Sequence, residues 1–387
     1  MVERIRRRGL EPAAEAWDFL SLALAAVTVD GIDRRNLSAD GWTRQLHLSV
    51  AATDPDRWSG VGPEIDRALS FLTTDMWSVS FMPGGCLPPR PRKHASVEAD
   101  TVALLSGGLD SLIGAIDLAA SGSTIFGVSQ TVRGDNSRQR LFAKRIGQGL
   151  QLIQLNHNAS TRRRQKETSQ RSRSIVFLAF AVLVASSLDK YKAGETIPIY
   201  ICENGFIAVN PPLTPARIGS LSTRTAHPNF LYQIQQVLDR VGLRVKITNP
   251  YIEKTKGEMM LQCSDQQILE EFASISTSCG RFQRFNYTHC GRCVPCQIRR
   301  ASFLAWGRLD KTTYHFEDLS IADSDYAMFD DVQAVKIAIE AARTDGLDRW
   351  IGNALNSPNI DNVSALRAML GRGLRELGEL HDSLRIP

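Results

Sequence analysis

One short stretch constrains this chain more than any other, because it joins an apolar run, a glycine-bearing loop and an amphipathic segment. The apolar run covers residues 101–105, the loop reads Ser-Gly-Gly-Leu-Asp-Ser over 106–111, and an apolar helical face follows over 112–119. This order predicts a buried parallel strand that delivers a small loop to the start of a helix. Glycines let a backbone approach an anion closely, and the free amides of a helix start bind phosphate. The stretch therefore predicts a phosphate-binding turn.

The loop also contains a carboxylate, which indicates what the loop binds besides phosphate. Asp110 would repel a bound phosphate unless a cation lay between them, which indicates a Mg²⁺ bridge. The alternative is an ordinary strand-turn-helix corner in which Asp110 caps the helix. The loop lacks the Gly-Lys-Ser/Thr ending of the Walker A motif, which disfavours simple phosphoryl transfer. The complete string resembles the SGGxDS signature of the PP-loop ATP pyrophosphatases, which adenylate a carboxyl or amide-like oxygen and release pyrophosphate.

Four cysteines are spaced like metal ligands: Cys279, Cys290, Cys293 and Cys296. Their two Cys-x2-Cys steps suit a tetrahedral Zn²⁺ site, and four thiolates leave no open coordination position, so such a site is structural. An iron–sulfur cluster is the alternative metal centre. His289 would be a ligand only if Cys279 lay elsewhere.

The composition is typical of a globular protein and argues against two classes. The chain has 387 residues, enough for two or three domains, and its formal net charge of +5 permits an anionic ligand without demanding one. Acidic residues precede the apolar run at 20–29, which argues against a secretory signal, and no run is long enough to span a membrane. Because the clustered cysteines have metal spacing rather than that of a disulfide ladder, we expect a reducing, cytoplasmic compartment.

The periodicity divides the chain into three regions. We expect an α+β extension with a proline-rich linker at residues 1–97 and the core at residues 98–310. We expect a helical tail at residues 311–387. In the extension we expect helices at 17–27 and 65–72 and strands at 43–50 and 77–82. In the tail we expect helices at 326–342, 347–355 and 363–384.

The core predicts a doubly wound, mostly parallel sheet, because strand-like and helical segments alternate along it. After the first strand and helix, strands are expected at 125–130, 152–155, 197–202 and 245–248, and helices at 138–150, 175–188 and 230–241. Ligands of such sheets bind beyond the carboxyl ends of the strands. Residues that follow strands are therefore candidates: Gln130, Glu203, Asn204, Lys254 and Lys256. The two lysines could neutralise polyphosphate or could simply be surface charge.

Two further segments carry candidate residues. A basic run at 162–174 leads into the apolar helix at 175–188, which brings Arg171 and Arg173 near the same rim. There Arg173 is expected to contact phosphate or carboxylate. The run is otherwise typical of a solvated loop, and RNA contact is disfavoured because no aromatic platform is interleaved with it. The long polar loop at 205–227 is typical of a lid or substrate loop. It contains Arg224 and His227, and His227 could equally precede a helix start.

The loop at 106–111 together with the four cysteines resembles the 7-cyano-7-deazaguanine synthase family. The loop alone is shared with asparagine, NAD and GMP synthetases and with tRNA-thiolating enzymes. Arg173, Lys254 and Lys256 stand where the family has an arginine before its apolar helix and a proline-then-lysine stretch. The resemblance covers about residues 100–305. It implies that ATP adenylates the carboxylate of 7-carboxy-7-deazaguanine and that a nitrogen nucleophile displaces AMP to give an amide. In the housekeeping family a second adenylation dehydrates that amide to a nitrile.

The resemblance also implies roles for the candidate residues, with ATP, Mg²⁺ and Zn²⁺ as cofactors. Catalysis is assigned to Asp110, Arg173 and Lys254. ATP binding is assigned to Ser106, Gly107, Gly108, Leu109, Asp110, Ser111, Gln130 and Lys256. Substrate binding is assigned to Glu203, Asn204, Arg224 and His227. Zinc binding is assigned to Cys279, Cys290, Cys293 and Cys296.

The two ends of the chain depart from the housekeeping enzymes, which lack residues 1–97 and the tail after about 311. The longer layout resembles proteins of bacterial antiphage-defence operons, understood to attach a deazaguanine to a protein N-terminus. This implies that a protein amine replaces ammonia as nucleophile. The alternatives are housekeeping synthesis from ammonia, another PP-loop amidation or thiolation of a nucleotide, and a non-catalytic nucleic-acid or scaffold protein. We expect no membrane partner, and the sequence is compatible with a homodimer.

Overall fold

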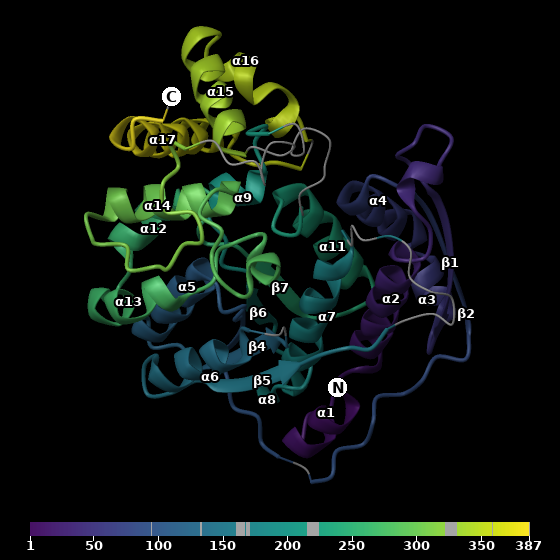
Figure 1. Ribbon diagram of the computed structural model, residues 1–387. Helices are drawn as coiled ribbons and strands as arrows, with labels where there is room; N and C mark the ends of the chain where they lie inside the picture. Colours follow the sequence, from purple (N-terminus) through teal and green to yellow (C-terminus); the bar gives the residue numbers. More distant parts are fainter. Residues whose placement is uncertain are drawn as a thin grey trace.

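A five-stranded sheet forms the centre of the molecule (Figure 1). The computed structural model describes residues 1–93, 95–131, 134–159, 167, 171–214, 224–321, 331–357 and 359–386. The strands stand in the order β5-β4-β3-β6-β7, and every neighbouring pair is parallel. They are β3 (Thr101–Leu104), β4 (Ile125–Gln130), β5 (Gln151–Leu155), β6 (Ile197–Tyr200) and β7 (Val245–Thr248). The mixed α/β class with a parallel sheet is confirmed.

The central strands are buried on both faces, which explains their continuous apolar sequence. Every residue of β3 is buried, and in β4 only the last residue is partly exposed. Helices α7 (Arg173–Ala185) and α11 (Pro228–Arg240) cover one face of the sheet. Helices α5 (Leu109–Ala120) and α6 (Asn136–Arg145) cover the other. A parallel sheet needs this cover on both sides.

The chain reverses its travel across the sheet at β3. From β3 it runs through β4 to the edge strand β5, and α7 then carries it back to β6 on the other side of β3. The loops that follow β3 and β6 therefore open beside each other, and ligands of doubly wound sheets bind at such a switch point. Residues 106–111, called the glycine loop below, lie at this point.

Several helices differ by a few residues from their predicted ranges, and α5 and α6 are two of them. Helix α5 begins at Leu109, earlier than the predicted 112–119, so Asp110 lies inside its first turn. Helix α6 ends at Arg145 and does not continue to 150. Gly147 and Gly149 follow it with positive φ values of 55° and 95°, which end a helix readily.

The first 83 residues form a layer against α7 and α11 (Figure 1). Its elements are α1 (Val2–Arg8), α2 (Ala14–Asp30), β1 (Gln45–Ala52), α3 (Pro55–Ser59), α4 (Gly62–Thr73) and β2 (Met76–Pro83). The predicted helices and strands of this region overlap these elements, and β1 and β2 pair in parallel. The apolar side chains of the layer belong to the same core as those of α7 and α11. The domain boundary near residue 97 stays a prediction.

A buried ion cluster joins this N-terminal layer to the start of α7. Arg44 lies 2.5 Å from Asp30 and 2.7 Å from Asp75, and Arg35 contacts both carboxylates. Asp30 also accepts hydrogen bonds from the backbone amide and the hydroxyl of Ser172, at 3.0 and 2.8 Å. Buried carboxylates are tolerated when they are paired and hydrogen-bonded in this way.

Arg171 corrects one expectation. We expected it near the rim with Arg173, but it donates a hydrogen bond to the carbonyl of Thr73 at 3.0 Å, and its guanidinium lies 4.7 Å from the ring of Trp42. Burial lowers the pKa of Arg171 to about 10, and the charge of Arg35 acts in the same direction. It therefore serves the N-terminal layer. Most of the basic run lies outside the described residues.

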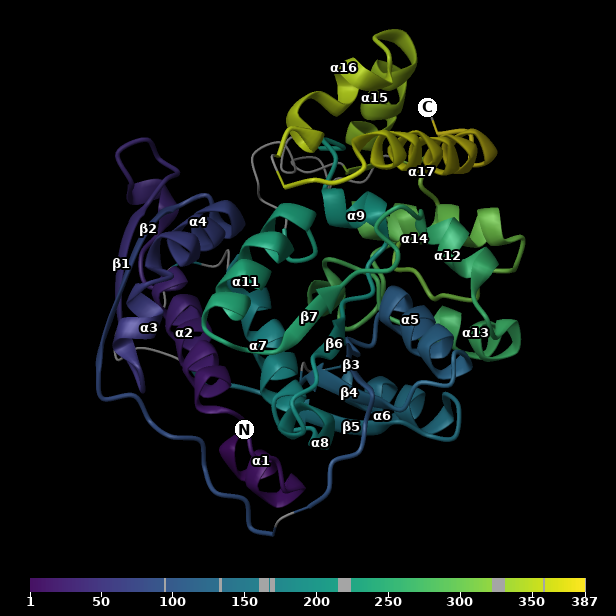
Figure 2. The ribbon, with the colours of Figure 1, turned by 180° about the vertical axis from the view of Figure 1, so that it is seen from behind.

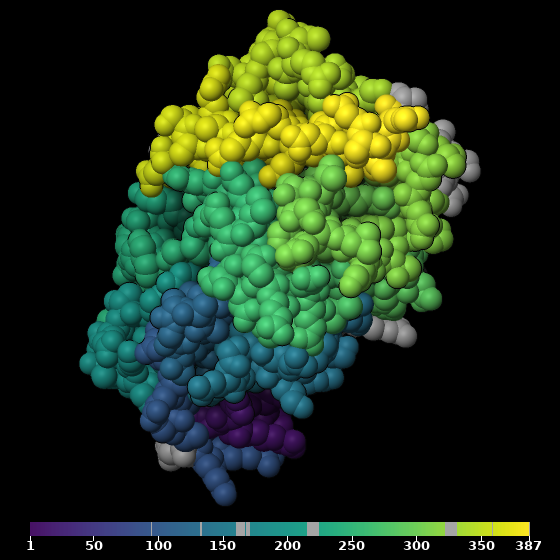
Figure 3. All heavy atoms as spheres, turned by 90° about the vertical axis from the view of Figure 1, so that its left-hand side faces the viewer, coloured from purple at the N-terminus to yellow at the C-terminus, as the bar shows by residue number. Residues whose placement is uncertain are grey.

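The C-terminal helices form a second layer beyond one end of the sheet (Figure 2). Helix α17 (Val363–Ser383) packs across α14 (Val294–Trp306) and α9 (Gly205–Val209), and it is the yellow band on the surface in Figure 3. Helices α15 (Asp331–Thr344) and α16 (Leu347–Ile351) complete this layer and share one apolar cluster with α17. No helix among the described residues is both long and apolar enough to cross a membrane.

Candidate functional site

The glycine loop is ordered by its own hydroxyl groups. The hydroxyl oxygen of Ser106 accepts a hydrogen bond from the amide of Gly108 at 3.1 Å, and the hydroxyl of Ser111 donates to the carbonyl of Gly108 at 2.9 Å. Gly107 has a φ of 91°, a left-handed conformation that glycine adopts without strain. Gly108 is the N-cap of α5. The loop thus presents the start of a helix with small residues around it.

Asp110 is held by two neighbouring loops and does not cap the helix. Its Oδ1 lies 2.8 Å from the ammonium of Lys256, and its Oδ2 accepts hydrogen bonds from the side chain and backbone amide of Asn204, at 2.7 and 3.2 Å. Asp110 is only 5% exposed and Lys256 6%. Burial alone would raise the pKa of Asp110, but the positive charge of Lys256 and the hydrogen bonds outweigh it and lower that pKa. The carboxylate is therefore ionised at neutral pH.

The two partners of Asp110 come from the loops after β6 and β7. Asn204 is the N-cap of α9, where its side-chain oxygen accepts from the amide of Ile207 at 3.0 Å. Lys256 opens α12 (Lys256–Gln262), which Thr255 and Glu258 start with a capping box. The two loops touch at Gly205, where a Cβ would lie 1.8 Å from the carbonyl oxygen of Ile252. Only glycine fits there, so this contact sets the distance between Asn204 and Lys256.

Helix α17 holds the turn that carries Lys256. Glu376 accepts a short hydrogen bond from the hydroxyl of Thr255, and Arg372 donates to Glu258 at 2.5 Å. Burial raises the pKa of Glu376 to about 7, and the nearby charge of Glu258 adds to this. The C-terminal layer is thereby connected to Asp110 through Thr255 and Lys256.

A pocket of about 290 Å³ opens beside the glycine loop. Ser106, Asp110, Ser111, Glu203 and Lys256 are among the residues that line it. Its opposite wall is formed by residues 277–280 with Pro295 and Ile298. The two walls are joined directly, because the amide of Thr277 donates to the carbonyl of Gly107 at 2.9 Å. A pocket of this size with a few convergent polar groups is a common form of ligand site.

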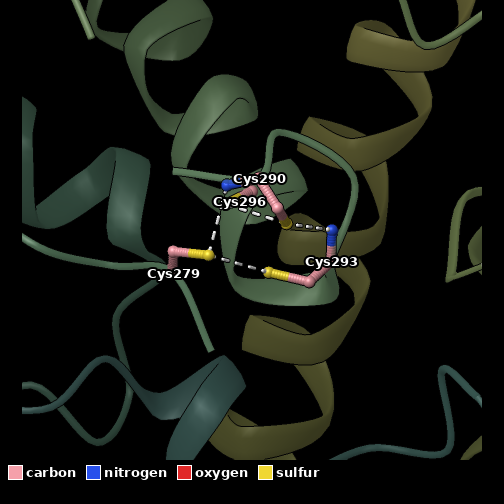
Figure 4. A group of neighbouring side chains, drawn as sticks. All are labelled: Cys279, Cys290, Cys293 and Cys296. Atoms are coloured by element: carbon pink, nitrogen blue, oxygen red, sulfur yellow. Dashed lines mark hydrogen bonds between the residues drawn. The ribbon is translucent and has the colours of Figure 1, made fainter. Parts of the chain in front are cut away.

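The four cysteines gather behind the second wall (Figure 4). Their sulfur atoms all lie within 4.8 Å of one another, and all four residues are buried. The sulfurs of Cys279 and Cys293 are 3.9 Å apart, as are those of Cys290 and Cys296. A tetrahedron with Zn–S bonds of about 2.3 Å has edges of about 3.8 Å. The donor set and its spacing therefore fit a tetrahedral metal ion such as zinc.

Backbone amides support the same reading of this cluster. The amides of Arg281 and Cys290 each donate to the sulfur of Cys279 at 3.3 Å, and the amide of Cys293 donates to the sulfur of Cys290 at 3.3 Å. Such bonds stabilise thiolates, the form that binds metal. His289 is not a ligand candidate, because its Nε2 accepts from the amide of Ser278 at 3.1 Å.

Three other predicted site residues do not line this pocket. Lys254 is half-buried, and its ammonium lies 5.6 Å from the ring centre of Tyr251. Arg173 is exposed at the first position of α7, where its charge acts on His157 after β5. Gln130 ends β4, and its carbonyl accepts from Gln139 at 3.2 Å. None of these three is among the described residues that line the pocket.

Arg224 and His227 line a separate pocket of about 400 Å³ together with Phe71 and Trp350. The guanidinium of Arg224 lies 4.9 Å from the ring centre of Phe71. The ring centre of His227 also lies 4.9 Å from that of Phe71. His227 caps α11, since its Nδ1 accepts from the amide of Asn229 at 3.2 Å, and burial lowers its pKa to about 4. The structure therefore separates Glu203 and Asn204 from Arg224 and His227. Residues 215–223 of the predicted lid lie outside the described residues.

Sequence reasoning missed three contributors to the pocket. The Asp110–Lys256 pair was not expected, because Asp110 was interpreted as a metal ligand or as a helix cap. Thr277 and Glu376 were not expected either, since each acts through a contact distant in sequence. One signal was present: the pattern Thr-x-x-Glu at 255–258 is that of a capping box and marks Lys256 as the first residue of a helix.

The fold and site define a mixed α/β protein with a polar pocket at the switch point of a parallel sheet and a cysteine cluster suited to metal. Comparison with known proteins adds a partial likeness. The chain is 33% identical over 88 residues to a 7-cyano-7-deazaguanine synthase from Methanocaldococcus jannaschii. The match covers 22% of this chain and 38% of that protein, so the chain spans about two fifths of the length of the curated relative it matches. No family model matches the chain.

Proposed function

We propose that the protein is an ATP-dependent, AMP-forming ligase that activates the carboxylate of a 7-deazaguanine at the glycine loop and transfers the acyl group to nitrogen. The observation that carries the proposal is the pocket itself. It joins a Ser-Gly-Gly-Leu-Asp-Ser turn at a sheet switch point to a wall backed by four cysteines. The partial likeness to a 7-cyano-7-deazaguanine synthase supports the substrate class.

In this proposal the glycine loop binds the pyrophosphate portion of ATP. The backbone at Gly107 and Gly108 and the hydroxyls of Ser106 and Ser111 line the pocket mouth with small polar groups, which suits close approach of phosphate oxygens. Lys256 contributes a buried positive charge beside the loop. A fixed cation in a site that excludes water stabilises developing negative charge more strongly than it would in water.

The proposed reaction has two balanced steps. A carboxylate oxygen of the substrate attacks the α-phosphorus of ATP, the bond to the bridging oxygen breaks, and pyrophosphate leaves. The resulting acyl adenylate is then attacked at its carbonyl carbon by an amine, which loses a proton as AMP leaves with the bonding electrons. The product is an amide. Formation of a nitrile would require a second ATP to activate the amide oxygen.

Two metals belong to the proposal. Zinc in the four-cysteine cluster would hold the second wall of the pocket in place and would leave no open position for substrate. Mg²⁺ would accompany ATP, and the carboxylates of Asp110 and Glu203, which line the same pocket, would hold it together with phosphate oxygens. The Oδ1 atom of Asp110 has a second lone pair besides the one that faces Lys256, so Asp110 could bind the metal while it keeps its contacts with Lys256 and Asn204.

The nitrogen nucleophile in this proposal is ammonia or the N-terminal amine of a protein from an antiphage-defence operon. The two N- and C-terminal layers add surface around the core that a docking protein could use. Co-expression with neighbouring operon proteins, followed by intact-mass spectrometry, separates the two. An added mass at a protein N-terminus identifies a protein acceptor, and free amide or nitrile product identifies ammonia.

The activation step is tested with the purified, zinc-loaded protein. Incubation with ATP, Mg²⁺ and 7-carboxy-7-deazaguanine should release pyrophosphate, and addition of an amine acceptor should then release AMP in an equal amount. Samples without the deazaguanine, and samples with benzoate in its place, are the controls. Absence of pyrophosphate and AMP from a folded, zinc-loaded sample would contradict the proposal, and release of ADP and phosphate instead would indicate a different phosphoryl chemistry.

A further inference from the structure

A hollow at the β5 edge of the sheet is lined by basic side chains. It has a volume of about 610 Å³ and lies between α1, in the N-terminal layer, and the edge formed by α6 and β5. Arg4, Arg7 and Arg8 come from α1, and Arg140 and Lys144 come from α6. No carboxylate is among the described residues that line it. This feature, called the basic groove below, plays no part in the proposed ligase reaction.

The positive charge of the basic groove is left largely uncompensated. Across the described part of the chain, Arg4, Arg8, Arg140 and Lys144 form no ion pair with a carboxylate. Their contacts are with neutral groups: Arg4 donates to the carbonyl of Gln154, and Arg140 donates to the side-chain oxygen of Gln154 at 3.1 Å. Hydrogen bonds of this kind orient a guanidinium without cancelling its charge.

Arg7 is paired, but its partner is shared. It lies 2.8 Å from Glu3, and the same carboxylate also contacts Arg6 at 3.4 Å and Arg92. One negative charge therefore serves three positive ones on this exposed surface. Exposed pairs of this type contribute little stability, so an incoming anion competes with Glu3 easily. The chain as a whole has a net charge of only +5, so the groove holds an unusual share of the excess.

The lining of the groove points to phosphate rather than to bases. Four of its five basic residues are arginines, whose planar guanidinium binds phosphate oxygens in pairs. Its floor is aliphatic, with Leu150, Leu152 and Ile153, and no aromatic side chain is among the described lining residues on which a base could stack. A partner that binds here would be recognised by its regularly spaced negative charges and not by its sequence.

We propose that the basic groove binds the phosphate backbone of a nucleic acid, without sequence preference. The basic run at 162–174, for which RNA contact is disfavoured, lies mostly outside the described residues, and the groove is a different surface. The inference does not depend on the ligase proposal, because the groove shares no lining residue with the pocket at the glycine loop.

Salt dependence tests the proposal. A fluorescently labelled DNA duplex of random sequence is titrated with the full-length protein at several salt concentrations, in the absence of ATP. The logarithm of the binding constant falls by about 0.9 per phosphate contacted for each tenfold rise in salt, so three to five contacts give a slope of roughly −3 to −4.5. A second duplex of unrelated sequence should bind within about twofold of the first, because contacts to phosphate carry no sequence information.

The double variant Arg8→Gln/Lys144→Gln removes one charge from each wall and breaks no ion pair among the described residues. It should reduce the magnitude of the slope by about 1.8, because two phosphate contacts are lost. The matched control is Arg308→Gln/Arg349→Gln, which removes two exposed arginines outside the groove and should leave the slope unchanged. Circular dichroism of both variants checks that α1 and α6 remain folded.

Three outcomes would overturn the proposal. The wild-type protein fails to bind the duplex at low salt, or the groove variant and the control variant bind with the same slope, or the protein prefers anionic vesicles or polyglutamate to nucleic acid of equal charge. The last result would assign the groove to a membrane surface or to an acidic protein. The double variant Asp110→Asn/Lys256→Met serves as an independent check, since both residues lie outside the groove and the variant should bind the duplex like the wild type even where ligase activity is lost.

Discussion

The glycine loop and the four-cysteine loop face each other across one pocket, but they are held in place by different means. The glycine loop is fixed by its own hydroxyls and by an ion pair that reaches two other loops of the sheet. The described segment between Cys279 and Cys293 has no strand or long helix. The buried guanidinium of Arg299 donates hydrogen bonds to Ser276 and Ser278 just before this segment, and the four thiols converge where a metal ion would add further support. One wall is therefore built by the sheet, and the other by side-chain hydrogen bonds together with the thiol cluster.

This difference gives the two walls different sensitivities. A change in the glycine loop should remove chemistry while the sheet remains, whereas a change in the cysteine cluster should release the wall and destabilise the fold around it. The predictions that follow test this contrast, beginning with the largest expected effect.

Loss of one cysteine should have the largest effect on stability. Cys293→Ala should abolish stoichiometric zinc binding and lower the free energy of unfolding by roughly 5 kcal/mol, since a structural zinc site contributes folding energy directly. Inductively coupled plasma mass spectrometry measures the zinc content, and urea denaturation measures the free energy of unfolding. Cys86→Ala, an exposed cysteine outside the cluster, is the control and should match the wild type. Full stability of Cys293→Ala without metal would show that the second wall stands unaided.

Asp110→Asn should remove most of the activity and also reveal the buried ion pair. We expect pyrophosphate release to fall at least about 100-fold, as when a preorganised electrostatic group is lost. The free energy of unfolding should fall by roughly 3–5 kcal/mol, because Lys256 is left buried without its carboxylate. Enzyme assays and urea denaturation measure the two effects.

The double variant Asp110→Asn/Lys256→Met separates stability from chemistry. It removes both charges, so it should regain most of the lost stability while staying inactive. If the double variant regained activity as well, Asp110 would be a structural partner of Lys256 and nothing more.

The two neighbouring lysines provide a matched pair. Lys256→Met should slow pyrophosphate release by about 100-fold, because Lys256 lies at the pocket beside Asp110. Lys254→Met should change it by less than about threefold, because Lys254 lies against the ring of Tyr251. The opposite order would restore the role that the sequence assigned to Lys254. Initial rates at saturating ATP are the measurement.

The smallest effect concerns Glu376. Its pKa is about 7 in the folded protein and near 4.5 in the unfolded chain, so folding favours its protonated form. Stability should therefore fall as pH rises from about 4.5 to 7 and stay low above that range. Glu376→Gln mimics the protonated form, so at pH 8 it should be more stable than the wild type by roughly 2 kcal/mol.

The comparison at pH 5 completes this test. There the wild type and Glu376→Gln should differ little, because Glu376 is then mostly protonated in the folded protein. The control is Glu270→Gln, which changes an exposed glutamate that is not among the charges acting on Glu376, and its difference from the wild type should not depend on pH in this way. A constant difference between wild type and Glu376→Gln from pH 5 to pH 8 would contradict the assignment.

The elements with strong local patterns could be predicted from the sequence, and the contacts between distant segments could not. The strand before the glycine loop is a continuous apolar run, and the spacing of the four cysteines alone predicts a metal site. The position of Lys256 depends on where α12 begins and on the contact at Gly205, which no local pattern encodes. Arg224 and His227 were grouped with Glu203 because one loop connects them, but that loop leads to a second pocket.

The parallel pair β1 and β2 has a consequence for how the chain unfolds. Strands that pair in parallel need a long connection, and here their layer shares its core with α7, which in turn lies on β3, β4 and β6. The buried salt bridges of Arg44 with Asp30 and Asp75 lie where this layer meets the start of α7. We therefore expect the N-terminal layer and the sheet to melt together, in one cooperative transition. We also expect that a protease cut in the linker at 84–93 leaves two fragments that stay assembled.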